Sequence, residues 1–82
     1  MTLKELKERV KAVHKIGYNN YKVTIVFRGK EYTCESNDSM AWDAINEPSW
    51  GSSNILYYTE KQAYQALYDE CKRKNQIGEY KI

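Results

Sequence analysis

The chain has 82 residues and a formal net charge of +2, from thirteen Lys or Arg and eleven Asp or Glu. This length predicts a single domain over residues 1–82, and so small a charge excess argues against a uniformly basic nucleic-acid binder. No apolar run approaches the roughly 20 residues that span a bilayer, so we expect no contact with a membrane. The charged opening does not resemble a secretory signal, and with only two Cys we expect a reduced, cytoplasmic protein.

The first predicted element is an amphipathic helix over residues 2–16. Its apolar residues recur at spacings of three and four, which places them on one face: Leu3, Leu6, Val10 and Val13. Thr2 and Glu5 have the spacing of a capping box at its start. Gly17 is placed to end the helix in a left-handed conformation.

A β-hairpin over residues 21–35 is the clearest local signal. Apolar and polar side chains alternate with period two, which predicts one apolar and one mixed face. Gly29-Lys30 fits a two-residue type II′ turn. That turn sets three pairs of residues opposite each other: Arg28 with Glu31, Phe27 with Tyr32, and Ile25 with Cys34.

Four more elements are predicted in order: a short helix over 40–46, a loop over 47–54, a strand over 55–58, and a last helix ending at Asn75 or Gly78. Thr59 and Gln62 form a second capping box at the start of that helix, and residues 78–82 are predicted to be a frayed tail. The expected fold is α+β, in the order helix, strand, strand, short helix, strand, helix. Its three-stranded antiparallel sheet carries the two longer helices on one face.

No group of residues predicts catalysis, a cofactor or a metal site, so we expect no enzyme. His14 lacks a recognisable catalytic partner, and a surface position in the last turn of the first helix is the simpler interpretation. Cys34 and Cys71 could be a nucleophile, a disulfide or a metal pair, but buried Cys residues acting as small hydrophobes explain them more simply. The central acidic residues fit no calcium-loop pattern and are interpreted as solvated: Glu31, Glu35, Asp38, Asp43 and Glu47.

Two surfaces are candidates for binding. The first would contact a protein partner through Trp50, Tyr57, Arg28 and Lys22, with Trp50 either exposed as an anchor or folded back over the core. The second would contact nucleic acid if the basic ends of the chain lie side by side. Its candidate residues are Lys4, Lys7, Lys11, Lys15, Lys61, Lys72, Arg73 and Lys74.

The order of helix, three strands and helix is similar to that of the double-stranded RNA-binding domain. The resemblance implies contacts to RNA from the first helix, from the loop between the first two strands, and from lysines at the start of the last helix. Here only Lys61 stands where that lysine cluster would be, the hairpin loop is just Gly29-Lys30, and residues 37–54 would be an insertion.

The first functional hypothesis is therefore a non-enzymatic binding module that acts through a protein partner. Its size and style suit an accessory or inhibitory protein of phage or mobile-element type. Nucleic-acid binding through the two basic helices is the alternative, ranked second because the middle of the chain is acidic. An exposed edge strand would also permit a homodimer.

Overall fold

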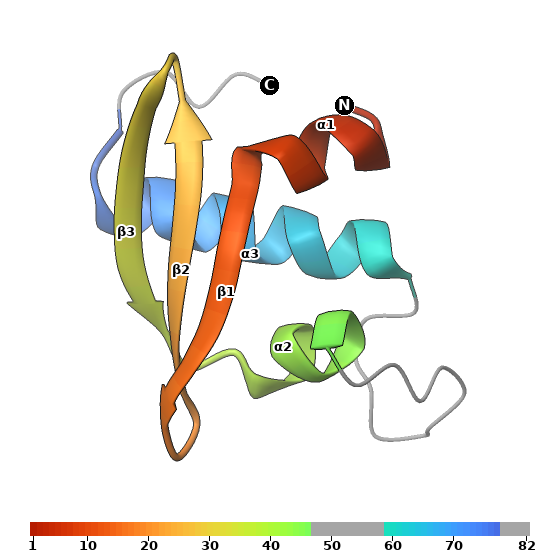
Figure 1. Cartoon of the computed structure of the whole chain (residues 1–82), viewed down its shortest axis with the longest axis vertical. Coiled ribbons are helices and arrows are strands. Elements are labelled where there is room, and N and C mark those ends of the chain that lie inside the picture. The colour runs from red at the N-terminus through yellow and green to blue at the C-terminus, as the bar shows by residue number, and fades with distance from the viewer. Residues whose placement is uncertain (47–58, 78–82) are drawn as a thin grey trace.

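The structure is a computed structural model, which describes residues 1–46 and 59–77. Six elements follow along the chain: α1 (Leu3–Arg9), β1 (Val10–Gly17), β2 (Asn20–Phe27), β3 (Lys30–Ser36), α2 (Ser39–Asn46) and α3 (Glu60–Lys74) (Figure 1). None of the described helices is long and apolar enough to cross a membrane.

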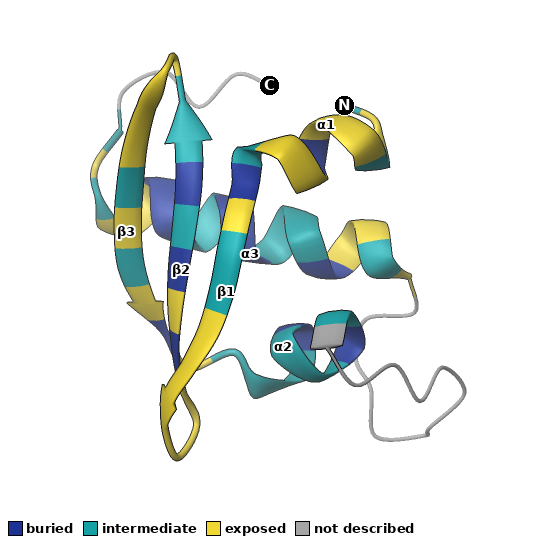
Figure 2. Cartoon of the chain, in the orientation of Figure 1, coloured by how far each residue is buried: buried dark blue, intermediate teal, exposed yellow. Residues whose placement is uncertain are grey.

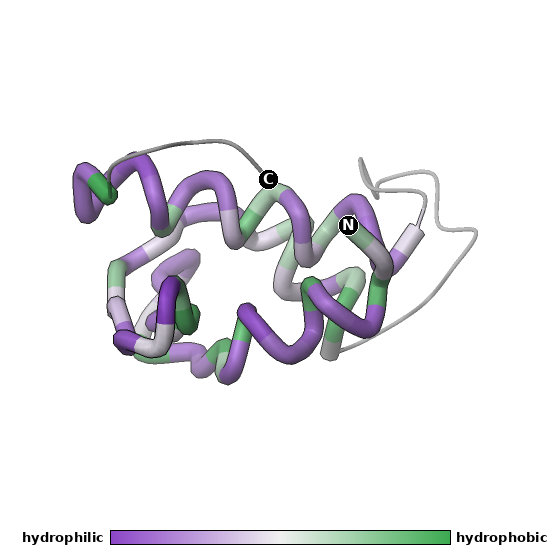
Figure 3. The backbone as a smooth tube through the Cα atoms, turned by 90° about the horizontal axis from the view of Figure 1, so that it is seen from above, coloured by the Kyte–Doolittle hydropathy of each residue, from purple (hydrophilic) through white to green (hydrophobic). Residues whose placement is uncertain are grey.

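The three strands form one antiparallel sheet in the order β1-β2-β3. Helix α3 crosses one face of this sheet and packs on all three strands, while α1 and α2 pack against α3. Seen from above, in Figure 3, the strands and α3 form two layers. The predicted class is therefore confirmed: α+β, with helices on one face of a three-stranded antiparallel sheet.

The core lies between these two layers. Val23 and Ile25 of the central strand are fully buried, as are Leu67 and Cys71 of α3. Helix α1 adds Leu6, and the other small or apolar core residues are Val10, Ala41, Ala44, Ala63 and Tyr68. Because β2 is the middle strand and α3 lies across it, the apolar face of the hairpin forms the sheet side of the core.

The predicted helix over residues 2–16 is wrong beyond Arg9. The chain leaves the helix there and continues as β1, which pairs with β2. A β-bulge explains why the pattern resembled a helix. Val10 pairs with Ile25 and Val13 pairs with Val23, so a step of three residues along β1 matches a step of two residues along β2. The extra residue at the bulge keeps both valines on the core face at a spacing of three.

The predicted turn at Gly29-Lys30 is also wrong. Phe27 pairs with Lys30, so the two-residue turn is Arg28-Gly29. Both turn residues have positive φ, 51° and 78°, which is the type I′ arrangement that suits the twist of paired strands. Val26, not Arg28, lies opposite Glu31. The register nevertheless keeps the predicted apolar face, because Ile25 now opposes Tyr32 and Val23 opposes Cys34.

The later helices match the sequence pattern closely. Thr59 and Gln62 form both hydrogen bonds of the capping box, and α3 ends at Asn75. Asp38 accepts a hydrogen bond from the backbone N–H of Ala41 at the start of α2. The sheet takes its third strand from residues 10–17, whereas the strand predicted over 55–58 and the tail over 78–82 lie outside the described residues.

Candidate functional site

The sheet has a second face, which we call the open face, and the described helices lie on the other side of the sheet. Its residues alternate along the strands with the core-facing ones: Ala12, His14, Lys22, Thr24, Val26, Glu31, Thr33 and Glu35. Two polar contacts cross it. Lys11 forms an ion pair with Glu31, and the hydroxyl oxygens of Thr24 and Thr33 lie 3.5 Å apart.

Lys22, one of the predicted partner-binding residues, is exposed on the open face. It lies between His14 on β1 and Glu35 on β3. His14 is a surface residue as predicted, but it stands in β1 and not in a helix. This part of the sheet can therefore offer an acceptor, a cation and an imidazole to a bound molecule side by side.

The β1–β2 hairpin ends in a tip, which we define as residues 16–20. Tyr18 is 91% exposed and Ile16 is 49% exposed, and they are the exposed large hydrophobic residues of the described chain. Asn19 follows with φ of 54°, a left-handed conformation that Asn adopts more readily than most residues. Figure 2 shows the whole tip as exposed, at the end of the sheet away from the Arg28-Gly29 turn.

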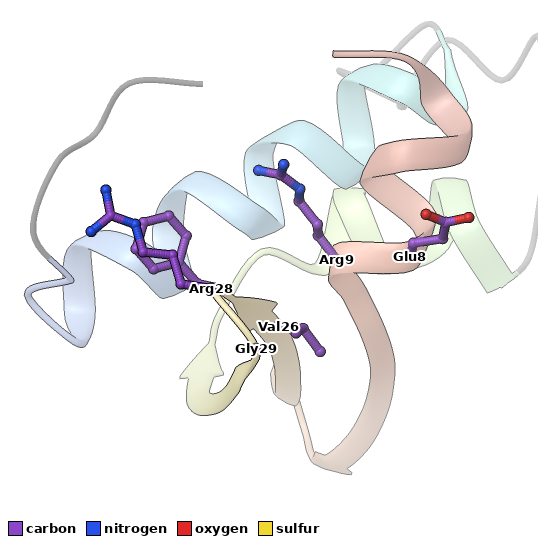
Figure 4. A pocket seen from close by; sticks show the side chains of 6 residues that line it. Glu8, Arg9, Val26, Arg28 and Gly29 are labelled. Atoms are coloured by element: carbon purple, nitrogen blue, oxygen red, sulfur yellow. The ribbon is translucent and has the colours of Figure 1, made fainter.

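A groove at the opposite end of the sheet, which we call the cationic groove, has a volume of about 440 Å³. It is lined by Glu8, Arg9, Val26, Phe27, Arg28 and Gly29. In the view of Figure 4 the side chains of Arg9 and Arg28 both extend to the side away from Glu8. Arg9 also donates a hydrogen bond of 3.4 Å to the hydroxyl of Tyr68 on α3. Arg28, predicted as a partner contact, is thus exposed beside this groove.

Lys72, one of the candidate nucleic-acid contacts, does not lie at the surface of the protein. Its side chain is buried, and its Nζ lies 4.5 Å from the centre of the Phe27 ring and 5.3 Å from that of Tyr68. Burial lowers the pKa of this ammonium group. The charge of Asp69 opposes this shift, whereas the positive charges of Arg9 and Arg28 add to it. Its aliphatic stem and aromatic neighbours make Lys72 part of the packing between α3 and β2.

The other predicted basic contacts do not form one surface. Lys4, Lys7 and Lys61 are exposed where α1 lies beside the start of α3, and Lys7 forms an ion pair of 2.8 Å with Glu60. Two other candidates lie on β1: Lys11 pairs with Glu31, and Lys15 lies 5.6 Å from the Trp42 ring. Arg73 and Lys74 are exposed at the far end of α3.

Two predicted partner contacts, Trp50 and Tyr57, lie outside the described residues. Sequence reasoning overlooked the two large hydrophobic residues that the described part of the chain exposes, Ile16 and Tyr18. The available signal was an aromatic residue directly before two Asn residues in a turn, because polar neighbours in a turn offer few apolar side chains to bury the aromatic ring. Among the described residues, no group of three or more His, Cys, Asp or Glu residues could hold a metal ion.

Comparison of the chain with family models, with curated proteins and with solved structures finds no match.

Proposed function

We propose that this chain is a non-enzymatic binding module and that it binds a protein partner through the tip of the β1–β2 hairpin. The observation that carries this proposal is the 91% exposure of Tyr18 next to the 49% exposed Ile16. We further propose that it is an accessory or inhibitory protein of phage or mobile-element type, which would act by blocking or recruiting that partner.

A protruding tyrosine favours a protein partner over other ligands. Tyr buries a large apolar area at low entropic cost and offers a hydroxyl for hydrogen bonding, so it is enriched at the energetic centres of protein interfaces. Ile16 adds apolar area, while the polar residues of the open face would supply a rim around this centre. Lys22 and Glu35, on neighbouring strands, give that rim charges of both signs.

The test is affinity capture from an extract of the source cells, with the wild type and a double variant, Ile16→Ser with Tyr18→Ser. Lys30→Ala, on β3 at the opposite end of the same sheet, is the matched control. We expect a captured protein to be lost by the double variant and retained by the control, with circular dichroism unchanged in both. Equal capture by wild type and double variant, or no specific capture at all, contradicts the proposal.

A second candidate is nucleic-acid binding, which one observation favours: α1 packs beside α3, so the first and last helices of the chain lie side by side. Lys4 and Lys61 are exposed there. The order α1, three strands, then α3 also keeps the resemblance to the double-stranded RNA-binding domain, with α2 inserted before α3. In the structure, the loop between the first two strands, β1 and β2, is Tyr18-Asn19. We rank this candidate second because element order alone does not determine function, and Glu60 neutralises Lys7.

Fluorescence anisotropy with short RNA and DNA, single-stranded and duplex, distinguishes the two candidates. Binding that weakens steeply with salt, and that is lost in a Lys4→Glu, Lys61→Glu variant but not in Lys22→Glu on the open face, would support the second candidate. The absence of binding at micromolar protein and low salt would rule it out.

A further inference from the structure

Two cysteines far apart in the sequence meet where α3 packs on the sheet. Cys34 is half-buried on β3, Cys71 is buried on α3, and both thiols are free. Two contacts fix the position of Cys71. Its sulfur lies 3.9 Å from the carbonyl oxygen of Val23, which pairs with Cys34, and 3.8 Å from that of Tyr32, two residues before Cys34. The two side chains are close enough for each thiol to shift the pKa of the other.

We propose that Cys34 and Cys71 form a dithiol site that small-molecule disulfides oxidise to an intramolecular Cys34–Cys71 disulfide. Neither the proposed partner-binding tip nor the nucleic-acid candidate depends on this site, so it stands on its own.

The two thiols have different surroundings, and these assign their roles. Cys34 is the more accessible of the two. Its interaction with Cys71 lowers the pKa of its thiol and the charge of Lys74 adds to this, against the opposing effects of burial and Glu70. The same pair interaction and burial raise the pKa of Cys71. A thiolate is the attacking form of a cysteine, so Cys34 attacks first and Cys71 resolves the product.

The reaction balances as two successive thiol–disulfide exchanges. The Cys34 thiolate attacks one sulfur of a disulfide R–S–S–R, the S–S bond breaks, and R–S⁻ leaves, to be protonated to R–SH. Cys71 then loses its proton and attacks the Cys34 sulfur of the mixed disulfide, which expels the second R–S⁻. The protein loses two hydrogen atoms and the small disulfide gains them as two thiols.

The neighbourhood of Cys71 holds its sulfur near Cys34. The side-chain amide of Asn75, at the end of α3, donates to the Cys71 carbonyl oxygen at 2.9 Å and contacts the Cys71 sulfur at 3.4 Å. Lys74 donates from its Nζ to the carbonyl oxygen of Glu35, directly after Cys34. The contact from Lys74 joins α3 to β3 next to Cys34 before any covalent bond forms.

Oxidised glutathione is the probe. The purified reduced protein is incubated with increasing ratios of oxidised to reduced glutathione, quenched with acid, alkylated and analysed by mass spectrometry with peptide mapping. We expect loss of both alkylation sites together, a peptide that links Cys34 to Cys71, and a rise of about 10 °C in the thermal midpoint. A stable mixed disulfide on the wild type, a disulfide between two chains, or two thiols that stay reduced would overturn the proposal.

Two variants separate the roles of the cysteines. Cys71→Ala is expected to stop at the mixed disulfide on Cys34, because the resolving thiol is absent. Cys34→Ala is expected to acquire glutathione at least tenfold more slowly than Cys71→Ala, because its remaining thiol, Cys71, is buried. Comparable rates in the two variants would contradict the assigned order of attack. The wild-type linkage test does not depend on either variant folding.

Discussion

The Nζ of Lys72 lies 4.5 Å from the centre of the Phe27 ring, so a buried cation on α3 rests on an aromatic side chain at the end of β2. Tyr68, one turn earlier on α3, supplies a second ring at 5.3 Å. Attraction between a cation and ring faces is strongest where water is excluded. This relationship offsets part of the cost of removing the ammonium group from water.

Replacing Lys72 tests how much this packing stabilises the fold. Lys72→Ala removes both the aliphatic stem and the contacts to the rings, so we expect a loss of about 2 kcal/mol in the free energy of unfolding. Lys72→Met keeps most of the stem and is expected to be the more stable of the two variants. Urea titrations of both proteins measure the difference. Equal loss in both variants would assign the effect to charge alone.

The lowered pKa of Lys72 gives its stability contribution a defined pH dependence. Below the folded-state pKa, Lys72 is charged in both states and the full cost of burying its charge is present. Just below pH 10.5 the folded protein releases this proton while the unfolded chain keeps it, so stability rises with pH. The stability of the wild type relative to Lys72→Met should therefore increase over that range. Comparing the two proteins cancels the titration of the tyrosines, and a flat difference would contradict the shift.

The sequence could predict the faces of the sheet but not its first strand. Alternation along residues 21–28 identified the core face, and the observed register preserves it because a shift of two residues leaves each side chain on its own face. The same logic failed at Val10 and Val13. A bulge gives a strand the spacing of a helix, and nothing local separates the two patterns.

The candidate site was less predictable for a related reason. Whether Lys72 is a surface cation or a core residue depends on Phe27, whose position relative to α3 only the tertiary packing sets. The meeting of Cys34 and Cys71 likewise depends on how α3 crosses β3. Capping boxes are local and were predicted well, as Thr59 and Gln62 illustrate.

Two glycines form a matched pair for testing the hairpin turn. A Cβ built on Gly29 would meet no atom within 4 Å, but this residue has φ of +78°. Gly29→Ala should therefore cost about 1 kcal/mol through backbone strain alone. Gly17→Ala is the control, because its Cβ would make only an ordinary contact of 3.7 Å with Asn20. Thermal unfolding of both variants measures the contrast, and equal midpoints would contradict the left-handed turn.

Ser36 connects the end of the sheet to two helices and is a sensitive point for stability. Its buried hydroxyl donates to Glu70 Oε2 at 2.5 Å and accepts from the backbone N–H of Asp38 at 3.1 Å. Ser36→Ala leaves both groups without this partner, which should cost about 1–2 kcal/mol. Thr33→Val removes an exposed hydroxyl from the same strand and is expected to change stability by less than about 0.5 kcal/mol. Similar losses in the two variants, measured by urea titration, would argue against a special role for Ser36.

The interaction between Cys71 and Cys34 predicts how the reactivity of Cys34 depends on pH. Because this interaction lowers the pKa of Cys34, its alkylation rate should reach half its maximum below the ordinary thiol value of about 8.5. Two charges on α3 act on the same thiol: Lys74 lowers its pKa and Glu70 raises it. Cys71→Ala should move the midpoint upward because its interaction with Cys34 is gone, whereas Lys74→Ala should raise it by a smaller amount. Rates measured by mass spectrometry with limiting iodoacetamide give the three midpoints. A Cys71→Ala midpoint equal to that of the wild type would show that the two thiols do not interact.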